Sequence, residues 1–318
     1  MGENNSLNHK DIYRYLDKII IQKTIANAYI FHGPEGVGKK KAAINFISKI
    51  IKNNNSDLNL FENVSEINNP DFILVEPTYL IKGNLINQSE IELDKSIKNK
   101  PQIRINQIRE VRKFLSKKAI QSDKKCILIT DAHLLNESAS NCLLKTLEEP
   151  DNGVFILLTS KLNLILETIT SRCHKIKFNG FTKKELRNLL TYEKNINNDA
   201  KNITKEIETL INLSNGSPGK LKSYKTIWEE IPSEIKERIK FPIDDYFSIF
   251  FLAKLITEEL DFSQQEFLIE YIQHIWWEKT KDQNIIQILE NIKLNLVSNV
   301  QPRLSWEANL LKIAIRDF

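Results

Sequence analysis

The sequence of 318 residues has few of the residues that mark several protein classes. It holds three cysteines, nine glycines, nine prolines and one methionine. Three cysteines without paired spacing argue against a disulfide framework and indicate reduced thiols. The small number of glycines and prolines, beside abundant Leu, Ile, Lys and Glu, favours a largely helical protein.

Long apolar runs and a dominant charge sign are also lacking. No apolar run reaches the roughly 20 residues that a membrane-spanning helix needs, and the polar residues 1–10 lack the apolar core of a signal peptide. We therefore expect a soluble, cytoplasmic protein without a membrane partner. The 45 basic and 41 acidic residues leave a net charge of +4, which neither indicates nor excludes nucleic-acid binding. The length allows two or three domains.

Residues 28–50 read as a strand, a glycine-rich turn and a helix in succession. An apolar run at 28–31 leads into GPEGVGK at 33–39, and apolar residues then recur at helical spacing. In this context a glycine-rich segment is a credible P-loop, whose backbone N–H groups converge on phosphate oxygens while its lysine reaches the β- and γ-phosphates. The candidate nucleotide-binding residues of this segment are Gly33, Gly36, Gly38 and Lys39.

The residue after the P-loop lysine departs from the pattern. A Ser or Thr hydroxyl at this position helps to hold Mg²⁺, but the residue is Lys40, which has no acceptor oxygen and whose ammonium would repel the metal. Two interpretations remain open. The loop holds ATP or ADP without efficient hydrolysis, or the turn keeps its shape with nothing bound.

A second nucleotide-site position follows the apolar run at 126–130. Asp131 stands at the C-terminal tip of this predicted strand, where open α/β sheets place their ligands and where a carboxylate suits Mg²⁺. The next residue, at which a glutamate would orient the attacking water, is Ala132. Loss of a general base typically costs ~10²–10⁴ in rate, and His133 in such a loop is more often a surface or packing residue. We therefore predict no efficient ATP hydrolysis at this site.

The most specific motif lies between residues 143 and 173. LLKTLEEP occupies 143–150 on a predicted helix, an apolar strand follows at 154–158, and TSRC occupies 170–173. These elements resemble the clamp-loader ATPases of the AAA+ class. The resemblance implies an α/β fold, with a AAA+ P-loop domain built on a parallel sheet, then a small helical lid and an all-α C-terminal collar.

The resemblance also implies roles for single residues. Arg172 of the Ser-Arg-Cys element is, in such proteins, a finger for the ATP site of a neighbouring subunit, and a finger in trans contributes roughly 10³–10⁵ in turnover in other nucleotide hydrolases. The alternative is a surface arginine paired with a nearby acid. Ser160 stands at the γ-phosphate sensor position, although Thr159 and Ser160 also suit a plain strand-end cap. Lys220, at the end of GSPGK, stands where relatives carry a second sensor, usually an arginine, and it is a weaker phosphate fork.

The composition changes midway along the chain, where amphipathic helical patterns without strand-like alternation begin. We expect a AAA+ P-loop domain over 1–180, a helical lid over 181–225 and a helical oligomerisation collar over 226–318. Residues 52–69 hold no cysteine or histidine, so the zinc module that relatives often carry there is not possible, and we expect no metal site. Residues 78–100 read as an irregular exposed insertion.

A degenerate hydrolytic site beside an intact Ser-Arg-Cys element resembles, within this class, the delta-prime subunits of bacterial DNA polymerase III. The resemblance implies a stator without intrinsic ATPase activity in a hetero-oligomeric ring of other clamp-loader subunits. Through this complex it would act on the sliding clamp and primed DNA during replication. One alternative is an active clamp-loader motor ATPase, which needs the missing hydroxyl and glutamate. The other is a stand-alone DNA-binding adaptor, which salt-sensitive DNA affinity would indicate.

Overall fold

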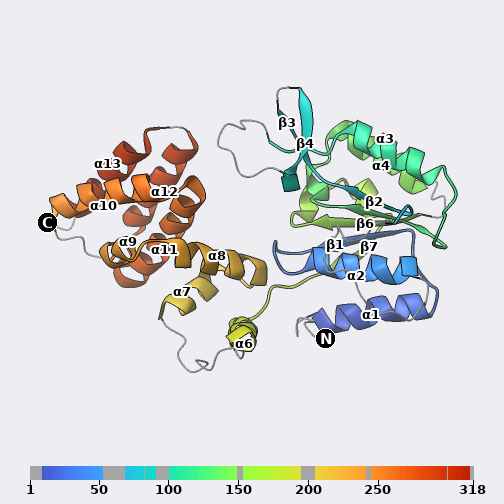
Figure 1. Ribbon diagram of the computed structural model, residues 1–318, viewed down its shortest axis with the longest axis horizontal. Helices are drawn as coiled ribbons and strands as arrows, with labels where there is room; N and C mark the ends of the chain where they lie inside the picture. Colours follow the sequence, from blue (N-terminus) through green and yellow to red (C-terminus); the bar gives the residue numbers. More distant parts are fainter. Residues whose placement is uncertain are drawn as a thin grey trace. The chain divides into compact units, whose positions relative to one another are not determined.

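A computed structural model describes residues 9–52, 69–81, 83–90, 100–148, 153–194, 205–240, 245–298 and 300–315. The chain divides into two compact units, Met1–Gly180 and Phe181–Phe318. Unit 1 is an α/β structure, and the described part of unit 2 is helical (Figure 1).

A parallel five-stranded sheet forms the centre of unit 1, in the order β2-β5-β6-β1-β7. Its strands are β1 (Ala28–His32), β2 (Phe72–Val75), β5 (Lys125–Ile129), β6 (Gly153–Thr159) and β7 (His174–Lys177). Every residue of β5 and β6 is buried, as their continuous apolar runs predict for parallel strands that are covered on both faces. Because the strands are parallel, their C-terminal ends meet at one edge of the sheet. The predicted α/β fold class is confirmed.

Helices cover both faces of the sheet. They are α1 (Lys10–Ile21), α2 (Lys39–Lys52), α3 (Ile105–Leu115), α4 (Glu137–Glu148) and the short α5 (Glu167–Thr170), with 3-10 turns η3 (Gln88–Glu90), η4 (Ala132–Leu134) and η5 (Leu162–Leu164). Figure 1 shows α1 and α2 below the sheet and α3 and α4 above it. Alternate residues of β1 point to opposite faces of the sheet. Tyr29 and Phe31 pack with α1 and α2 on one face. Ala28 and Ile30 pack with α3 and α4 on the other.

The insertion at 78–100 is not irregular throughout. Strands β3 (Thr78–Ile81) and β4 (Asn84–Asn87) form an antiparallel hairpin, and Gly83 provides a positive φ of 85° in its turn. The sequence expectation was wrong for this part because the two strands are only four residues long and partly exposed, so they show little apolar alternation. Residues 91–99 lie outside the described residues.

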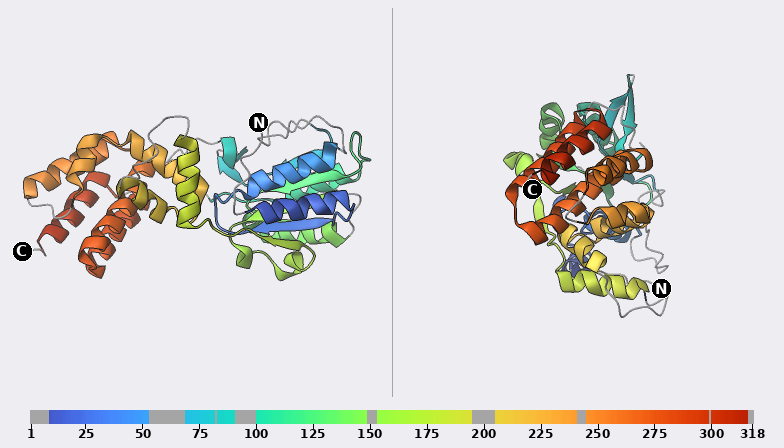
Figure 2. Two further views of the ribbon diagram at one scale, coloured as in Figure 1. Left: turned by 90° about the horizontal axis from the view of Figure 1, so that it is seen from below. Right: turned by 90° about the vertical axis from the view of Figure 1, so that its left-hand side faces the viewer.

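Unit 2 is built from α6 (Lys183–Lys194), α7 (Lys205–Leu213), α8 (Pro218–Glu230), α9 (Ser233–Arg238), α10 (Tyr246–Glu259), α11 (Phe262–Thr280), α12 (Gln283–Val297) and α13 (Pro302–Ala314). Figure 2 shows α10–α13, coloured orange to red, packed alongside one another. One hydrophobic cluster runs through the whole unit. The predicted lid–collar boundary at residue 225 falls inside α8, and the division of this unit into lid and collar stays a prediction. In the described part of the chain, no helix has both the length and the apolar character to cross a membrane.

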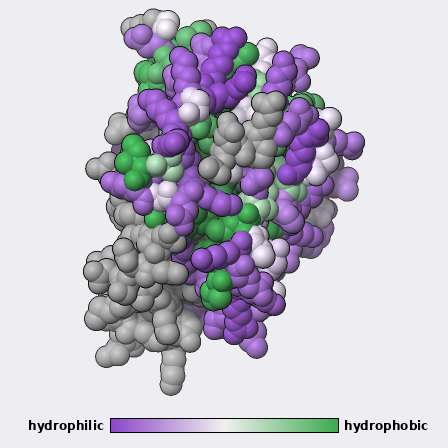
Figure 3. Space-filling model, turned by 90° about the vertical axis from the view of Figure 1, so that its right-hand side faces the viewer, coloured by the Kyte–Doolittle hydropathy of each residue, from purple (hydrophilic) through white to green (hydrophobic). Residues whose placement is uncertain are grey.

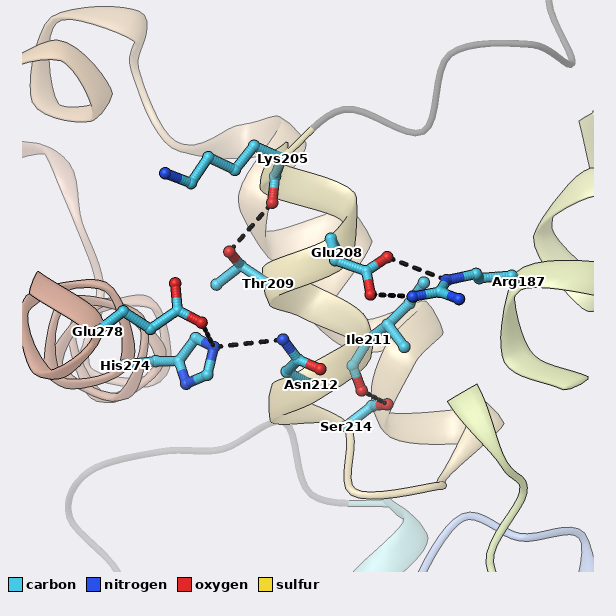
Figure 4. A network of polar contacts seen from close by, with 9 residues as sticks. All are labelled: Arg187, Lys205, Glu208, Thr209, Ile211, Asn212, Ser214, His274 and Glu278. Carbon is cyan, nitrogen blue, oxygen red and sulfur yellow. Dashed lines mark hydrogen bonds and ion pairs between the residues drawn. The ribbon is translucent and has the colours of Figure 1, made fainter. Parts of the chain in front are cut away.

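Polar contacts join α7 to α6 and to α11 (Figure 4). Arg187 of α6 donates two hydrogen bonds to the Glu208 carboxylate of α7, one of them 3.1 Å long between Nε and Oε2. These hydrogen bonds lower the pKa of Glu208. On the other side, the Asn212 amide nitrogen lies 3.4 Å from His274 Nε2, which lies 3.5 Å from Glu278 Oε1. The contacts fix α7 between its two neighbours within unit 2.

Candidate functional site

The glycine-rich turn joins β1 to α2 and has the backbone conformation of a phosphate cradle. Gly33, Gly36 and Gly38 all have positive φ, of 147°, 70° and 99°. A Cβ at Gly33 would lie 2.0 Å from the carbonyl oxygen of Phe178, whereas a Cβ at Gly38 would meet nothing within 4 Å. The turn therefore requires glycine for its shape and leaves open space at the start of α2. An N-terminal helix end of this kind attracts phosphate.

Lys39 rests on carbonyl groups of the turn itself. Its Nζ donates hydrogen bonds to the carbonyl oxygens of Gly33, at 2.7 Å, and Pro34, at 2.5 Å. Burial lowers the pKa of Lys39, and the carboxylates of Asp131 and Glu35 act in the opposite direction. A phosphate group bound in the turn would compete with these carbonyls for the ammonium.

Lys40 turns towards an acid on the neighbouring strand connection. Its Nζ lies 3.4 Å from Oε1 of Glu76, whose Oε2 accepts a hydrogen bond of 2.5 Å from the Ser89 hydroxyl. Across the described ranges, no three His, Cys, Asp or Glu side chains are grouped as a metal site. The position at which a hydroxyl is expected to help hold Mg²⁺ therefore carries a cation that lies beside Glu76.

The second half of the candidate site lies on the same edge of the sheet. Asp131 and Ser160 follow the C-terminal ends of β5 and β6, and β6 lies between β5 and β1 in the sheet. Asp131 has a left-handed backbone conformation, with φ 45° and ψ 48°. Burial raises the pKa of its carboxyl group. The nearby positive charges of His133, Lys39 and Lys40 act in the opposite direction and lower this pKa in part. The sheet thus brings Asp131 and Ser160 to the edge at which the glycine-rich turn lies.

The groups next to Asp131 include no carboxylate at the position after it. Ala132 is buried and has no carboxylate. His133 Nδ1 lies 3.3 Å from the Thr159 hydroxyl, and burial lowers the pKa of this histidine. The Thr159 hydroxyl also accepts a hydrogen bond of 3.0 Å from the backbone N–H of Lys161. This contact agrees with the strand-end cap that the sequence left as an alternative for Thr159 and Ser160.

Arg172 lies at the opposite edge of the sheet. It stands two residues before β7, whose first residue, His174, pairs with Tyr29 near the start of β1. The glycine-rich turn follows the other end of β1. At about 3.3 Å per residue, this strand of five residues separates the two edges by roughly 16 Å.

The Arg172 guanidinium makes two contacts within unit 1. Nη2 donates a hydrogen bond of 2.8 Å to Oε1 of Glu148, and Nη1 donates one of 2.9 Å to the carbonyl oxygen of Thr168. This is the pairing with a nearby acid that the sequence left open as the alternative to a finger. The guanidinium borders a groove of ≈ 560 Å³, which is lined by Ile25, Ala26, Asn27, Ala28, Leu147, Glu148, Arg172 and His174.

Lys220 belongs to unit 2, where its backbone N–H caps the start of α8 by donating to the Ser217 hydroxyl at 3.1 Å. Its sensor role therefore stays a prediction.

Sequence reasoning missed Glu76 and Glu148, the partners of Lys40 and Arg172. Each pair is separated by more than 20 positions in the chain, and no local spacing signals such contacts.

Known proteins match both units. Residues 8–182 match the family model described as DNA polymerase III, delta subunit, and residues 184–313 match the model for the C-terminal domain of cyanobacterial DNA polymerase III delta prime. The two matches together extend over most of the chain.

Relatives include DNA polymerase III subunit tau of Bacillus subtilis, 28% identical over 176 residues, which are 55% of this chain and 28% of the relative. Subunit delta' of Pseudomonas aeruginosa is 29% identical over 155 residues, 46% of this chain and 42% of the relative. The chain thus spans less than half the length of these two relatives. A crystal structure of a DNA polymerase III gamma subunit-related protein from Thermotoga maritima has a TM-score of 0.53 and 18% identity, over 98% of this chain and 100% of that one, and shows likeness of fold alone. The resemblance inferred from the degenerate site beside the Ser-Arg-Cys element is confirmed: because the delta subunit model covers more than half of the chain, the protein belongs to the DNA polymerase III delta subunit family.

Proposed function

We propose that the protein is a delta-prime-like stator of the DNA polymerase III clamp loader. It does not hydrolyse ATP efficiently itself, and it lends Arg172 to the ATP site of a neighbouring subunit while the ring loads the sliding clamp on to primed DNA. The observation that carries this proposal is the place of Arg172, at the edge of the sheet opposite the protein's own P-loop.

The distance between the two edges supports a role in trans. An arginine side chain is much shorter than the roughly 16 Å length of β1, so the Arg172 guanidinium cannot contact a phosphate held in the turn at 33–39. Its side chain is 39% exposed and is permanently charged, which suits phosphate oxygens presented by another subunit.

The protein's own candidate site supports the absence of hydrolysis. Lys40, paired with Glu76, replaces the hydroxyl that helps to hold Mg²⁺, and Ala132 replaces the glutamate that would orient water. In the proposed function, any ATP or ADP that binds to the turn is not hydrolysed efficiently. The motor ATPase is therefore the weaker alternative.

Helix α10 supports the proposed collar. Four aromatic side chains near its start are exposed, namely Tyr246, Phe247, Phe250 and Phe251. Residues 247, 250 and 251 recur at helical spacing and form one apolar strip, a pattern that is typical of protein interfaces. By contrast, hydrophobic residues on the face of the molecule in Figure 3 appear as small separate areas among hydrophilic ones. We assign the aromatic strip of α10 to a contact with a neighbouring subunit of the ring.

The test is Arg172→Ala in a ring reconstituted with the other clamp-loader subunits. We expect steady-state ATP turnover to fall, because the site that receives the finger loses roughly 10³–10⁵ in rate while the other sites continue. Arg14→Ala is the matched control, since Arg14 is also an exposed arginine paired with an acid, Asp11, and it should leave turnover unchanged.

Three other results would contradict the proposal. Normal ATP turnover and normal clamp loading by the ring with Arg172→Ala would contradict the finger role of Arg172. Strong ATPase activity of the isolated protein would favour the motor subunit instead. Steeply salt-dependent DNA affinity of the isolated protein would favour the DNA-binding adaptor.

A further inference from the structure

The ion pair between Arg172 and Glu148 is placed where the proposed finger would have to act. Glu148 is the last residue of α4 and Arg172 follows α5, and both side chains line the groove of ≈ 560 Å³. Nη2 of the arginine lies 2.8 Å from Oε1 of the glutamate, and the two side chains are 39% and 51% exposed. The guanidinium is therefore held at a defined place but remains open to a ligand from outside.

Glu148 does not stabilise α4 through its position at the C-terminal end of this helix. The C-terminal end of a helix carries partial negative charge, which disfavours an acidic side chain and favours a basic one. Glu148 is thus unfavourable for the helix unless a cation compensates it, and Arg172 is the cation that it contacts. Replacing the carboxylate with an amide is expected to leave the stability of the fold nearly unchanged.

A carboxylate and a phosphate group compete for the same N–H groups of a guanidinium. The guanidinium has five N–H donors in one plane; Glu148 and Thr168 each take one of them in this structure. A phosphate that binds bidentately needs two neighbouring donors, and the negative charge of Glu148 repels it at short range. Three N–H donors remain, but the phosphate and Glu148 are both anions at one guanidinium, so phosphate binding to Arg172 competes with its contact with Glu148.

Resting on the proposed function of Arg172, we propose that Glu148 is a positioning residue for this finger. It holds the guanidinium at the groove until phosphoryl oxygens of the ATP bound to the neighbouring subunit displace it. Because one anion replaces another, Arg172 binds only a ligand with strong negative charge, such as a phosphate chain. The free energy of the Glu148–Arg172 ion pair is subtracted from the free energy with which Arg172 binds that ligand.

The expected effect follows from the exposure of the pair. An ion pair between exposed side chains contributes little free energy. Its loss changes an equilibrium constant by a factor of about 1.5 to 5. With Glu148→Gln, kcat/KM for ATP at the site that receives the finger should rise by this factor at low salt, because Arg172 is no longer held by a charge, and kcat/KM of the whole ring should rise by a smaller factor. The difference from the wild type should shrink as salt is added, because screening weakens the Glu148–Arg172 pair.

The experiment compares five rings that differ only in this subunit: wild type, Glu148→Gln, Glu167→Gln, Arg172→Ala and the double variant Glu148→Gln/Arg172→Ala. Glu167→Gln is the matched control, since it makes the same charge change on an exposed residue of α5 in the same segment. The measurements are ATP turnover against ATP concentration at low and high salt, and the thermal unfolding of each isolated variant.

The inference predicts that Glu148→Gln raises kcat/KM, that Glu167→Gln does not, and that Glu148→Gln has no effect when Arg172 is already Ala. If Arg172→Ala lowers turnover but Glu148→Gln equals the wild type or lowers turnover too, the finger stands and the role of Glu148 is wrong. An effect of Glu148→Gln that persists in the double variant would also overturn it. If Arg172→Ala changes nothing, the proposed function itself fails, and the inference fails with it.

Discussion

The carboxylate of Asp71, directly before β2, accepts hydrogen bonds from the loop that leads into β5. The donors are the backbone N–H groups of Ile120, Gln121 and Ser122, at 2.9, 2.7 and 2.8 Å, and the Ser122 hydroxyl, at 2.9 Å. Burial alone would raise the pKa of Asp71, but the hydrogen bonds outweigh it and the pKa is lowered. One buried side chain therefore fixes a loop 50 residues further along the chain.

Asp71→Ala is expected to destabilise unit 1 by about 1–3 kcal/mol, because it leaves buried N–H groups without their acceptor. Since the folded pKa lies below the unfolded value of about 3.9, the contribution of the charged carboxylate is present above that pH and is lost as the pH falls through the folded pKa. Urea unfolding at pH 7 and near pH 3 measures both effects, and the gap between variant and wild type should narrow in acid. Asp11→Ala, which removes an acid that is 95% exposed, is the control; equal stability of both variants at pH 7 would contradict the role of Asp71.

At the candidate site, the sequence shows which residues depart from the P-loop pattern but not which contacts those residues make. Lys40 and Ala132 are visible because they interrupt a local pattern of known spacing. Their surroundings are not: Glu76 meets Lys40, and Glu148 meets Arg172, only because the sheet and its helices bring distant segments together. Tertiary ion pairs of this kind have no signature in the sequence.

Among the helices and strands, prediction succeeded where burial left a local signal. The inner strands are continuous apolar runs, and both are buried along their whole length. The β3–β4 hairpin was missed because Leu80 and Leu85 are exposed and give no core-facing pattern. Periodicity reports which face is buried, so an exposed hairpin escapes it.

The aromatic strip of α10 leads to a prediction about assembly. The Phe247 side chain is 81% exposed, so Phe247→Asp should leave the fold intact. If the strip contacts a neighbouring subunit, the charge should weaken association of the ring by about tenfold or more, as expected for an aromatic anchor. Size-exclusion chromatography of the reconstituted ring at decreasing concentration measures this. Ile21→Asp on α1, where the isoleucine is 80% exposed, is the control, and equal effects of the two changes would contradict a specific contact at α10.

At the level of the whole molecule, each unit has its own hydrophobic core. Two buried clusters consist of residues between Tyr13 and Phe178, and the third consists of residues between Phe181 and Ala314. The packing thus separates residues 1–180 from residues 181–318, and the assignment of a P-loop domain, a lid and a collar stays a prediction. Within unit 2 the packing crosses the expected lid–collar boundary at residue 225, because Tyr224 of α8 packs against Phe267 of α11 with 5.0 Å between the ring centroids.

These separate cores predict that the two units unfold independently, and the chain carries its own probe. All four tryptophans, at positions 228, 276, 277 and 306, lie in unit 2. The indole N–H groups of Trp276 and Trp306 donate to partners in the same unit, the Ile239 carbonyl at 2.8 Å and Gln265 Oε1 at 3.1 Å. In urea, tryptophan fluorescence therefore follows unit 2 alone, whereas far-ultraviolet circular dichroism follows both units.

We expect the two signals of the full chain to give transitions that do not coincide, which is the mark of unfolding that is not two-state. A fragment of residues 181–318 should fold, unfold cooperatively and show the same fluorescence midpoint as the full chain, because the core that surrounds its tryptophans is complete without unit 1. Coincident transitions in the full chain, together with a fragment that fails to fold, would mean that unit 2 depends on unit 1 for its stability. In the proposed ring, loosening of unit 1 would then also weaken the contacts that unit 2 is proposed to make with neighbouring subunits.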